Sequence, residues 1–286
     1  MKRAILVFVL LAVSAAPAGM RDDAELTASQ EYYVGRAVAA QTLKKYRIYH
    51  RVDDPLQTYV TLVGETVALE SDRPITFKGY HFIVLDTPDV NAFAAPSGFV
   101  FITTGLLRLL KTEDELAGVL AHEIAHVNLR HPELVAQKAT DTHTAKAAKD
   151  AAKTADDVAE GIGGLLGKKI PKGVSKALDY AGVFFGVLEE VFDAVLKGYS
   201  REKEEEADKL AVDILVRPGV RYDPRGLRDA LGRMQGERTW SWKGSSHPDP
   251  KARVALIDKH LATLGDLPAT DADRTKAFEE ATRPLR

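Results

Sequence analysis

Two histidines and a glutamate stand close together in the stretch Ala121-His122-Glu123-Ile124-Ala125-His126. Positions i and i+4 of an α-helix lie on the same face, so His122 and His126 can present two imidazoles to one metal ion. Glu123 lies about 100° further round the helix axis, where it can reach a water molecule at the metal without binding the metal itself. This spacing indicates zinc-assisted hydrolysis. The simpler alternative is a charged helix face with two incidental histidines.

The third ligand has to be a histidine or a carboxylate, because the chain contains no cysteine. Residues 199–208 form an acidic cluster ahead of a helical apolar pattern, and such a cluster taken alone more often marks a solvated face. Helical geometry separates its carboxylates: Glu204 and Asp208 share one face, whereas Glu205 shares a face with Lys209 and is expected to point to solvent. Glu204 is therefore the predicted third ligand, and Asp208 is placed to hold a ligand imidazole in the right tautomer.

A further histidine, His131, follows five residues after His126. One class of zinc proteases takes its third ligand from a histidine six residues after the second, with a glycine between. Neither the spacing nor Pro132 fits that pattern. We interpret His131 as a partner of the helix dipole at the helix C-terminus.

Local patterns predict the elements that must position these residues. Helices are expected over residues 22–45 and from Pro55 onward, and a buried strand over residues 80–85. Two short strand-like runs flank the turn signal Pro96-Ser97-Gly98 and predict a hairpin. Its edge either receives an extended peptide by main-chain hydrogen bonds or simply covers the core. Thr112-x-x-Glu115 is a capping box that starts the metal-site helix, and Pro132 is expected to stop it. The fold class is thus α+β, mostly helical, with a small sheet beside the helix that carries the histidines.

The N-terminus has the pattern of a secretory signal peptide over residues 1–18. Lys2 and Arg3 precede an apolar run over residues 4–16, and Ala16-Pro17-Ala18 resembles a cleavage site. The alternative is an uncleaved anchor, although the run is short for a membrane span. We expect an exported chain that is periplasmic or membrane-associated on the periplasmic side.

The rest of the chain is expected to form one metallopeptidase domain over residues 19–262, with a C-terminal tail over residues 263–286. Residues 136–182 are rich in Ala and Lys, then in Gly, and predict a mobile insertion. The insertion is either a lid or plug over the cleft, a membrane contact or a solvated spacer. A formal net charge of -2 over 286 residues gives no electrostatic reason to expect a nucleic-acid partner.

Several motifs occur in one order along residues 25–260. They are Asn-Ala-Phe-Ala-x-Pro-x-Gly, Thr-x-Gly-Leu-Leu, His-Glu-Ile-Ala-His, Ser-Arg-x-x-Glu-x-x-Ala-Asp and a late His-Pro with an arginine. In this order they resemble the gluzincin family of HtpX, BepA and the CAAX prenyl proteases, which are zinc metallopeptidases with a zincin-like domain.

The resemblance implies one Zn²⁺ per chain, bound by His122, His126 and Glu204, with Glu123 as the general base. It further implies that Asp208 supports a ligand, that His247 stabilises the oxyanion and that Arg253 supports the site. Integral members of the family carry several membrane spans, and the BepA-like members carry helical repeats after the protease domain. Neither feature is visible in this sequence, which resembles a stand-alone soluble member.

The predicted function is a zinc-dependent endopeptidase of the bacterial cell envelope that hydrolyses misfolded or envelope proteins with a zinc-activated water. The alternative is an envelope assembly factor, or chaperone-like factor, whose protease site is self-inhibited. Polypeptides are the expected partners, and contact with the membrane or with outer-membrane proteins is left open. The substrate, the cleavage preference and the oligomeric state do not follow from the sequence.

Overall fold

The computed structural model describes residues 26–50, 55–142, 186–236 and 250–286. The chain divides into two compact units, of which the larger comprises Thr27–Leu134 and Phe192–Arg286. In the smaller unit the described residues 135–142 and 186–191 are helical. None of the helices in the described ranges combines the length and the apolar character that a membrane span requires.

The larger unit contains a four-stranded sheet in the order β1-β2-β4-β3. β2 and β4 are parallel, and β3 and β4 form an antiparallel pair in which Phe93 lies opposite Phe101. A short 3-10 turn, η1, joins β3 to β4, and Ser97 adopts a left-handed φ of 62° in it. The predicted hairpin is therefore confirmed. The strands are β1 (Arg47–Ile48), β2 (His81–Asp86), β3 (Ala92–Ala95) and β4 (Phe99–Thr103).

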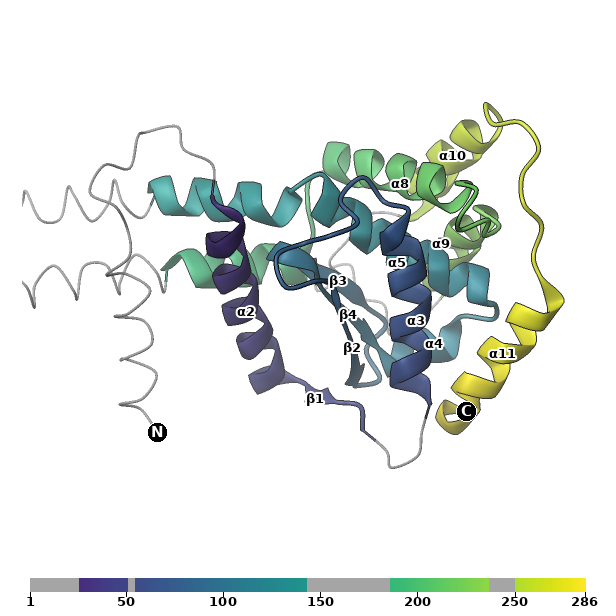
Figure 1. Cartoon of the computed structure of the whole chain (residues 1–286), viewed down its shortest axis with the longest axis horizontal. Helices are drawn as coiled ribbons and strands as arrows, with labels where there is room; N and C mark the ends of the chain where they lie inside the picture. Colours follow the sequence, from purple (N-terminus) through teal and green to yellow (C-terminus); the bar gives the residue numbers. More distant parts are fainter. Residues whose placement is uncertain (1–25, 51–54, 143–185, 237–249) are drawn as a thin grey trace, which may run out of the picture. The chain divides into compact units, whose positions relative to one another are not determined.

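Helices make up most of the larger unit (Figure 1). The first two helices form where the sequence carries helix signals. Thr27 and Gln30 form a capping box at the start of α2, and the buried residues of α3 recur at intervals of three and four. The helices of the larger unit include α2 (Ala28–Lys45), α3 (Leu56–Leu69), α4 (Thr104–Leu109), α5 (Glu113–Asn128), α8 (Arg201–Leu215), α9 (Arg225–Gly236), α10 (Pro250–Leu261) and α11 (Ala272–Thr282), with the 3-10 turns η1 (Pro96–Gly98) and η2 (Arg283–Leu285).

Helix α5 lies at the centre of the packing in the larger unit. It contacts α3, α8, α9, α11 and β3, and its residues from Glu113 to Val127 are buried. The Thr112 side chain caps it by accepting a hydrogen bond from the Glu115 backbone N–H at 3.2 Å. The reciprocal half of the predicted capping box is absent, because the Glu115 carboxylate accepts instead from the Lys111 N–H at 2.8 Å.

Two glycines allow close approach of α5 and α9. A Cβ on Gly118 of α5 would lie 2.5 Å from the backbone nitrogen of Leu227, and a Cβ on Gly226 would overlap the Asp114 carbonyl. The two helix backbones therefore touch without intervening side chains. This contact places the α9 side chains next to the face of α5 that carries the histidines.

The C-terminal residues also belong to this packing. Residues 263–286, predicted as a tail, contain α11, whose Phe278 is fully buried in the core. The Arg108 guanidinium donates a hydrogen bond to the Leu285 carbonyl at 2.6 Å. Helix α11 thus packs on the same core as α3 and α5.

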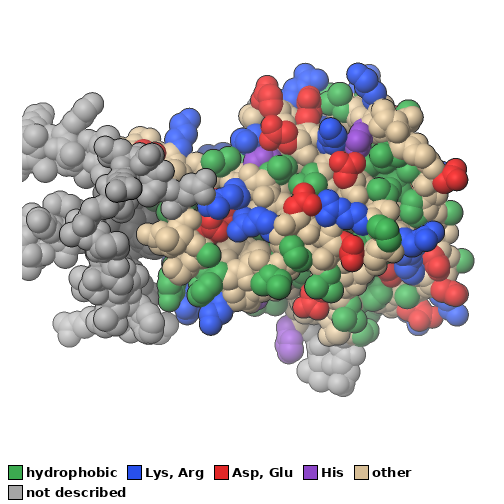
Figure 2. Space-filling model, turned by 45° about the horizontal axis from the view of Figure 1, so that its top comes forward, with side chains coloured by type: hydrophobic (Ala, Val, Ile, Leu, Met, Phe, Trp, Pro, Cys, Tyr) green, Lys and Arg blue, Asp and Glu red, His purple; other side chains and the backbone are tan. Residues whose placement is uncertain are grey.

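The observed architecture confirms the α+β, mostly helical fold class with a small sheet beside α5. The predicted signal peptide, most of the predicted insertion and His247 lie outside the described residues. On the face shown in Figure 2, acidic and basic side chains of the described residues are interspersed.

Candidate metal centre

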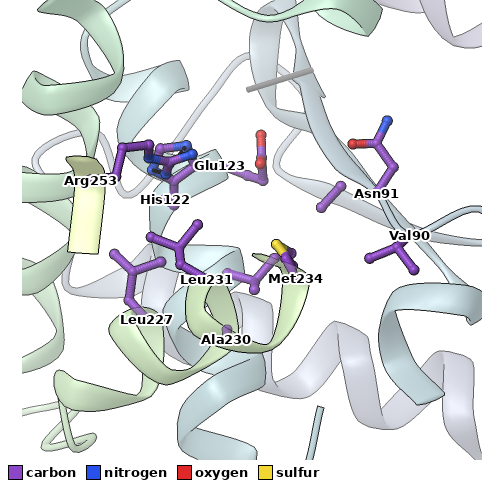
Figure 3. A pocket seen from close by; sticks show the side chains of 11 residues that line it. Val90, Asn91, His122, Glu123, Leu227, Ala230, Leu231, Met234 and Arg253 are labelled. Atoms are coloured by element: carbon purple, nitrogen blue, oxygen red, sulfur yellow. Dashed lines mark hydrogen bonds between the residues drawn. The ribbon is translucent and has the colours of Figure 1, made fainter. Parts of the chain in front are cut away.

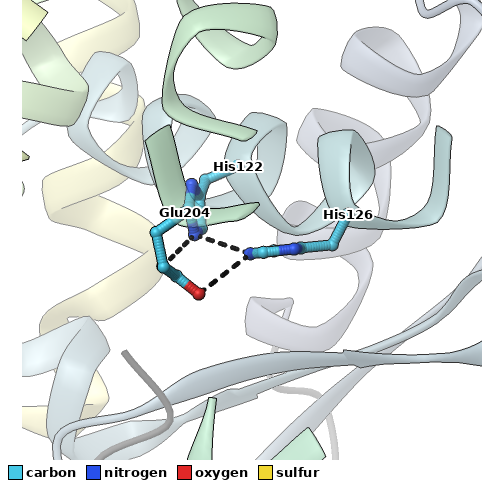
Figure 4. A group of neighbouring side chains, drawn as sticks. All are labelled: His122, His126 and Glu204. Atoms are coloured by element: carbon cyan, nitrogen blue, oxygen red, sulfur yellow. Dashed lines mark hydrogen bonds and ion pairs between the residues drawn. The ribbon is translucent and has the colours of Figure 1, made fainter. Parts of the chain in front are cut away.

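Three potential ligands from α5 and α8 converge in the larger unit (Figure 4). The Nε2 atoms of His122 and His126 are 3.0 Å apart. The Glu204 carboxylate approaches both, with Oε2 at 3.4 Å from His122 Nε2 and Oε1 at 3.5 Å from His126 Nε2. His126 and Glu204 are completely buried, and His122 is 3% exposed. Two imidazole nitrogens and a carboxylate thus face one point from which solvent is excluded.

The close approach of α8 to α5 depends on small residues. Ala207 and Ala211 are fully buried on the same face of α8 as Glu204 and Asp208. Side chains this small let two helices pack closely, which brings the short Glu204 side chain within reach of both histidines. Glu205 lies on another face and pairs with Arg201 at 2.9 Å on the surface.

A charged pair supports His122 from behind. Oδ1 of Asp208 lies 2.9 Å from His122 Nδ1, and the Arg253 guanidinium of α10 binds the same carboxylate at 2.6 and 2.8 Å. Arg253 also lies 3.2 Å from Glu204. Burial alone would raise the pKa of Asp208, but Arg253 and His122 outweigh it and hold that pKa below its usual range. Burial and Arg253 lower the pKa of His122, yet its carboxylate partners raise it by more, so the net shift is upward.

Glu123 lies beside this cluster at the edge of a small, mainly apolar hollow. In Figure 3 its carboxylate stands between the His122 ring and the Asn91 side chain, with α9 across the hollow. The remaining lining is largely apolar and comes from α5, from α9 and from the segment entering β3: Val90, Ala92, Val119, Leu227, Ala230, Leu231 and Met234, with Arg253 of α10. The Glu123 carboxylate therefore lies next to a space lined mainly by apolar side chains.

His131 lies elsewhere than the sequence suggested. Helix α5 ends at Asn128, Arg130 adopts a left-handed φ of 57°, and the turn places the His131 ring against His126, with 2.8 Å between their Nδ1 atoms. The interpretation of His131 as a helix-dipole partner is therefore wrong, because its ring contacts a side chain and is 1% exposed. Pro132 follows α5 and lies in the first turn of a second helical stretch over residues 131–142.

The surroundings of His131 keep it neutral. Burial and the nearby Lys203 lower the pKa of His131 to about 4, although Glu206 acts in the opposite direction. The Tyr199 ring packs on His126 and His131, with centroid distances of 4.6 and 5.6 Å. Burial also raises the pKa of the Tyr199 hydroxyl.

Comparison with known proteins identifies the family. The profile described as "Peptidase family M48" matches residues 55–261, a range that contains α5, α8 and α10 with all the converging residues. The chain belongs to peptidase family M48. Family M48 is a family of peptidases, and relatives of this chain are named as a metalloprotease and a metalloendopeptidase.

Relatives of this M48 chain are named as proteases. It is 28% identical over 209 residues to the beta-barrel assembly-enhancing protease of Escherichia coli. The aligned stretch covers 71% of this chain and 39% of that protein. It is 30% identical over 191 residues to the metalloprotease YcaL of E. coli, covering 66% of this chain and 63% of the relative. A shorter match to the mitochondrial metalloendopeptidase OMA1 of Bos taurus is 47% identical over 60 residues, or 21% of this chain and 11% of the relative. The chain thus spans about two fifths of the length of the beta-barrel assembly-enhancing protease.

Proposed function

We propose that this M48 chain is a zinc-dependent endopeptidase in which His122, His126 and Glu204 bind the metal and Glu123 is the general base. The convergence of the three ligand groups carries the proposal. Tetrahedral ligands at the usual zinc distances lie roughly 3.3–3.4 Å from one another, and the atoms here are separated by 3.0, 3.4 and 3.5 Å. Two imidazoles and one carboxylate, with no thiolate in the chain, are the donor set of catalytic zinc sites that keep one position open.

The chain's own residues would divide the work of hydrolysis. When bound, zinc supplies a Lewis acid that polarises a carbonyl and makes water acidic near neutral pH. Glu123 accepts a proton from the attacking water and passes it to the leaving amine, so that one water and one peptide bond yield a carboxylate and an amine. Asp208 accepts a hydrogen bond from Nδ1 of His122 and leaves Nε2 for the metal. By its resemblance to the family, His247 would donate a hydrogen bond to the oxyanion of the substrate.

The hollow beside Glu123 would bind a substrate side chain next to the scissile bond. Its lining is mainly apolar, and α9 contributes Leu227, Leu231 and Met234. β3 is an edge strand of the described sheet, and Ala92 at its start also lines the hollow. An extended peptide added along β3 would pass over Glu123 and place an apolar side chain in the hollow.

We further propose that the chain works on the periplasmic side of a bacterial envelope and degrades misfolded or envelope proteins. The signal-peptide pattern of residues 1–18 supports export. One relative is named for enhancing beta-barrel assembly. By analogy, this chain would contact outer-membrane proteins. Residues 19–262 would form the metallopeptidase domain.

Burial of the site favours a second candidate function. Glu123 is 2% exposed, and the three ligand residues are buried as well. On this account the cluster would have to open further before a peptide bond reached the ligand atoms. The chain would then act mainly as an assembly factor or chaperone-like factor whose protease site is held shut until a partner opens it.

Substitution of the proposed base distinguishes these functions. Glu123→Gln keeps the shape of the side chain and the metal ligands, so the variant should bind zinc like the wild type and lose casein hydrolysis by two to four orders of magnitude, on the order expected for a general base. Glu205→Gln is the matched control and should cleave normally. Chelator-sensitive cleavage by Glu123→Gln at the wild-type rate would reject the assignment. Rescue of an envelope defect by Glu123→Gln would favour the second function.

A further inference from the structure

The buried imidazole of His131 contacts the His126 ring on the side that faces away from the candidate metal centre. Nε2 of His126 faces His122 and Glu204, so Nδ1 lies on the opposite side of the ring. There it meets Nδ1 of His131 at 2.8 Å. The other nitrogen of His131, Nε2, lies 3.3 Å from Oε2 of Glu206 on α8. The side chains of His126, His131 and Glu206 therefore form one continuous chain of polar contacts.

Metal binding by Nε2 of His126 would fix the positions of the protons along the contacts from His126 through His131 to Glu206. A neutral imidazole has one nitrogen that donates and one that accepts. If Nε2 of His126 offers its lone pair to a metal, Nδ1 of His126 carries the proton and donates to Nδ1 of His131. His131 then carries its own proton on Nε2, from which it donates to the Glu206 carboxylate. Each contact has one donor and one acceptor.

We propose that His131, held by Glu206, is a positioning residue that fixes the tautomer and ring orientation of His126 for metal binding. The inference rests on the proposed zinc site. It gives the two ligand histidines separate supports that differ in kind. His122 rests on the buried ion pair of Asp208 and Arg253, whereas His126 rests on the ring of His131, which in turn contacts the Glu206 carboxylate on the surface.

The surroundings of His131 fit a support and not a ligand. Its Nδ1 meets His126 on the side of that ring opposite the cluster, and its Nε2 faces Glu206. The potential metal ligands that converge among the described residues are His122, His126 and Glu204. The Tyr199 ring packs on His131 and His126 and restricts rotation of either imidazole. The Glu206 side chain is 55% exposed and also lies 3.7 Å from Lys203, so the outer end of the support can be altered without opening the core.

The test compares four variants of the full chain with the wild type, each checked for folding by circular dichroism. Zinc affinity is measured by competition with a chromophoric chelator, and the absorption spectrum of the cobalt-substituted protein reports ligand geometry. His131→Phe keeps a ring and removes the acceptor, and should weaken zinc binding by about 10–100-fold, the range seen when such outer partners are lost. His131→Asn keeps an acceptor oxygen near the position of Nδ1 and should recover part of that loss.

The outer carboxylate has its own matched control. Glu206→Gln should weaken zinc binding by a few-fold, whereas Glu205→Gln, one residue away and also on the surface, should leave the affinity unchanged. Wild-type affinity and an unaltered cobalt spectrum for His131→Phe would overturn the proposal, as would equal effects of the two glutamate variants. If His131→Phe does not fold, the pair of glutamate variants decides. Failure of the wild type itself to bind zinc would reject the proposed function instead.

Discussion

The Arg253 guanidinium binds the Asp208 carboxylate through two hydrogen bonds, Nη2 to Oδ1 at 2.6 Å and Nε to Oδ2 at 2.8 Å. Both side chains are almost completely buried. A buried pair of this kind is strongly destabilising to break, because the remaining charge has no solvent. Arg253 therefore balances the buried carboxylates of Asp208 and Glu204 on α8.

Replacing Arg253 with methionine should lower the free energy of unfolding of the chelator-treated protein by about 3–5 kcal/mol, since Asp208 loses its partner. Arg228→Met is the matched control on α9. Its partners Asp229 and Asp258 lie at the surface, so the loss should stay below about 1 kcal/mol. Urea unfolding measures both. Zinc should reduce the difference between the variants, and equal losses for the two would contradict this role of Arg253.

A charge introduced at the hollow should change cleavage preference. Met234 is half-buried in the lining of the hollow, so Met234→Lys places a cation beside the expected apolar side chain of the substrate. Cleavage next to apolar residues should fall by about tenfold or more, because side-chain fit in a pocket of this kind commonly changes rates by such factors. Gln235→Lys adds the same charge on the exposed neighbour and should leave the preference unchanged. Mass spectrometry of casein fragments shows which bonds are cut, and an unchanged pattern in Met234→Lys would exclude the hollow as the specificity site.

The contact between α5 and α9 can be tested with glycine substitutions. Gly118→Ala introduces a Cβ 2.5 Å from the backbone nitrogen of Leu227, which should force the helices apart and lower stability by about 1–3 kcal/mol. The same change at Gly232 of α9 meets no atom within 4 Å and should stabilise by up to about 1 kcal/mol through helix propensity. Thermal melts distinguish the two. Equal effects would mean that the helices tolerate a side chain between them.

A buried carboxylate should make stability depend on pH. Burial raises the pKa of Glu133 from 4.5 to about 7, and Glu31 adds to this, while the Ser97 N–H and Arg73 act in the opposite direction. Glu133 in turn helps to raise the pKa of the nearby Tyr199 hydroxyl. Because the folded pKa lies above the unfolded value, the folded protein binds more protons between them, and this contribution to stability is lost as the pH rises from about 4.5 to 7.

Glu133→Gln removes the titration and keeps an acceptor for the Ser97 N–H. Relative to the wild type, the variant should gain up to about 3 kcal/mol of stability between pH 5 and pH 8. Glu65→Gln on the exposed face of α3 should change nothing. Urea titrations at the two pH values give the comparison, and parallel pH profiles for Glu133→Gln and the wild type would refute the prediction.

Local sequence signals account well for single elements. The turn residues Pro96-Ser97-Gly98 predicted the hairpin of β3 and β4, and Thr112 predicted the start of α5. The helix period separated Glu204 from Glu205, and the structure places the first in the core and the second on the surface. These predictions succeed because each depends on residues close together in the chain.

Features that depend on tertiary packing could not be predicted from the sequence. The parallel pairing of β2 with β4 joins strands that are not consecutive, and no local pattern encodes it. The position of His131 depends on the left-handed conformation of Arg130, a residue type that does not signal such a turn. The hollow beside Glu123 requires α9 to lie against Gly118 of α5. Arg253 was assigned through family resemblance alone, because its partners lie 45 and 49 positions away on another helix.

The central claim is that Glu204 completes a zinc site with His122 and His126. Metal analysis of purified wild type, Glu204→Gln and Glu205→Gln after dialysis against limiting zinc tests it most directly. The wild type and Glu205→Gln should each retain about one zinc per chain, as expected for a single catalytic site, whereas Glu204→Gln should retain almost none. Equal zinc content in the two glutamine variants would contradict the account.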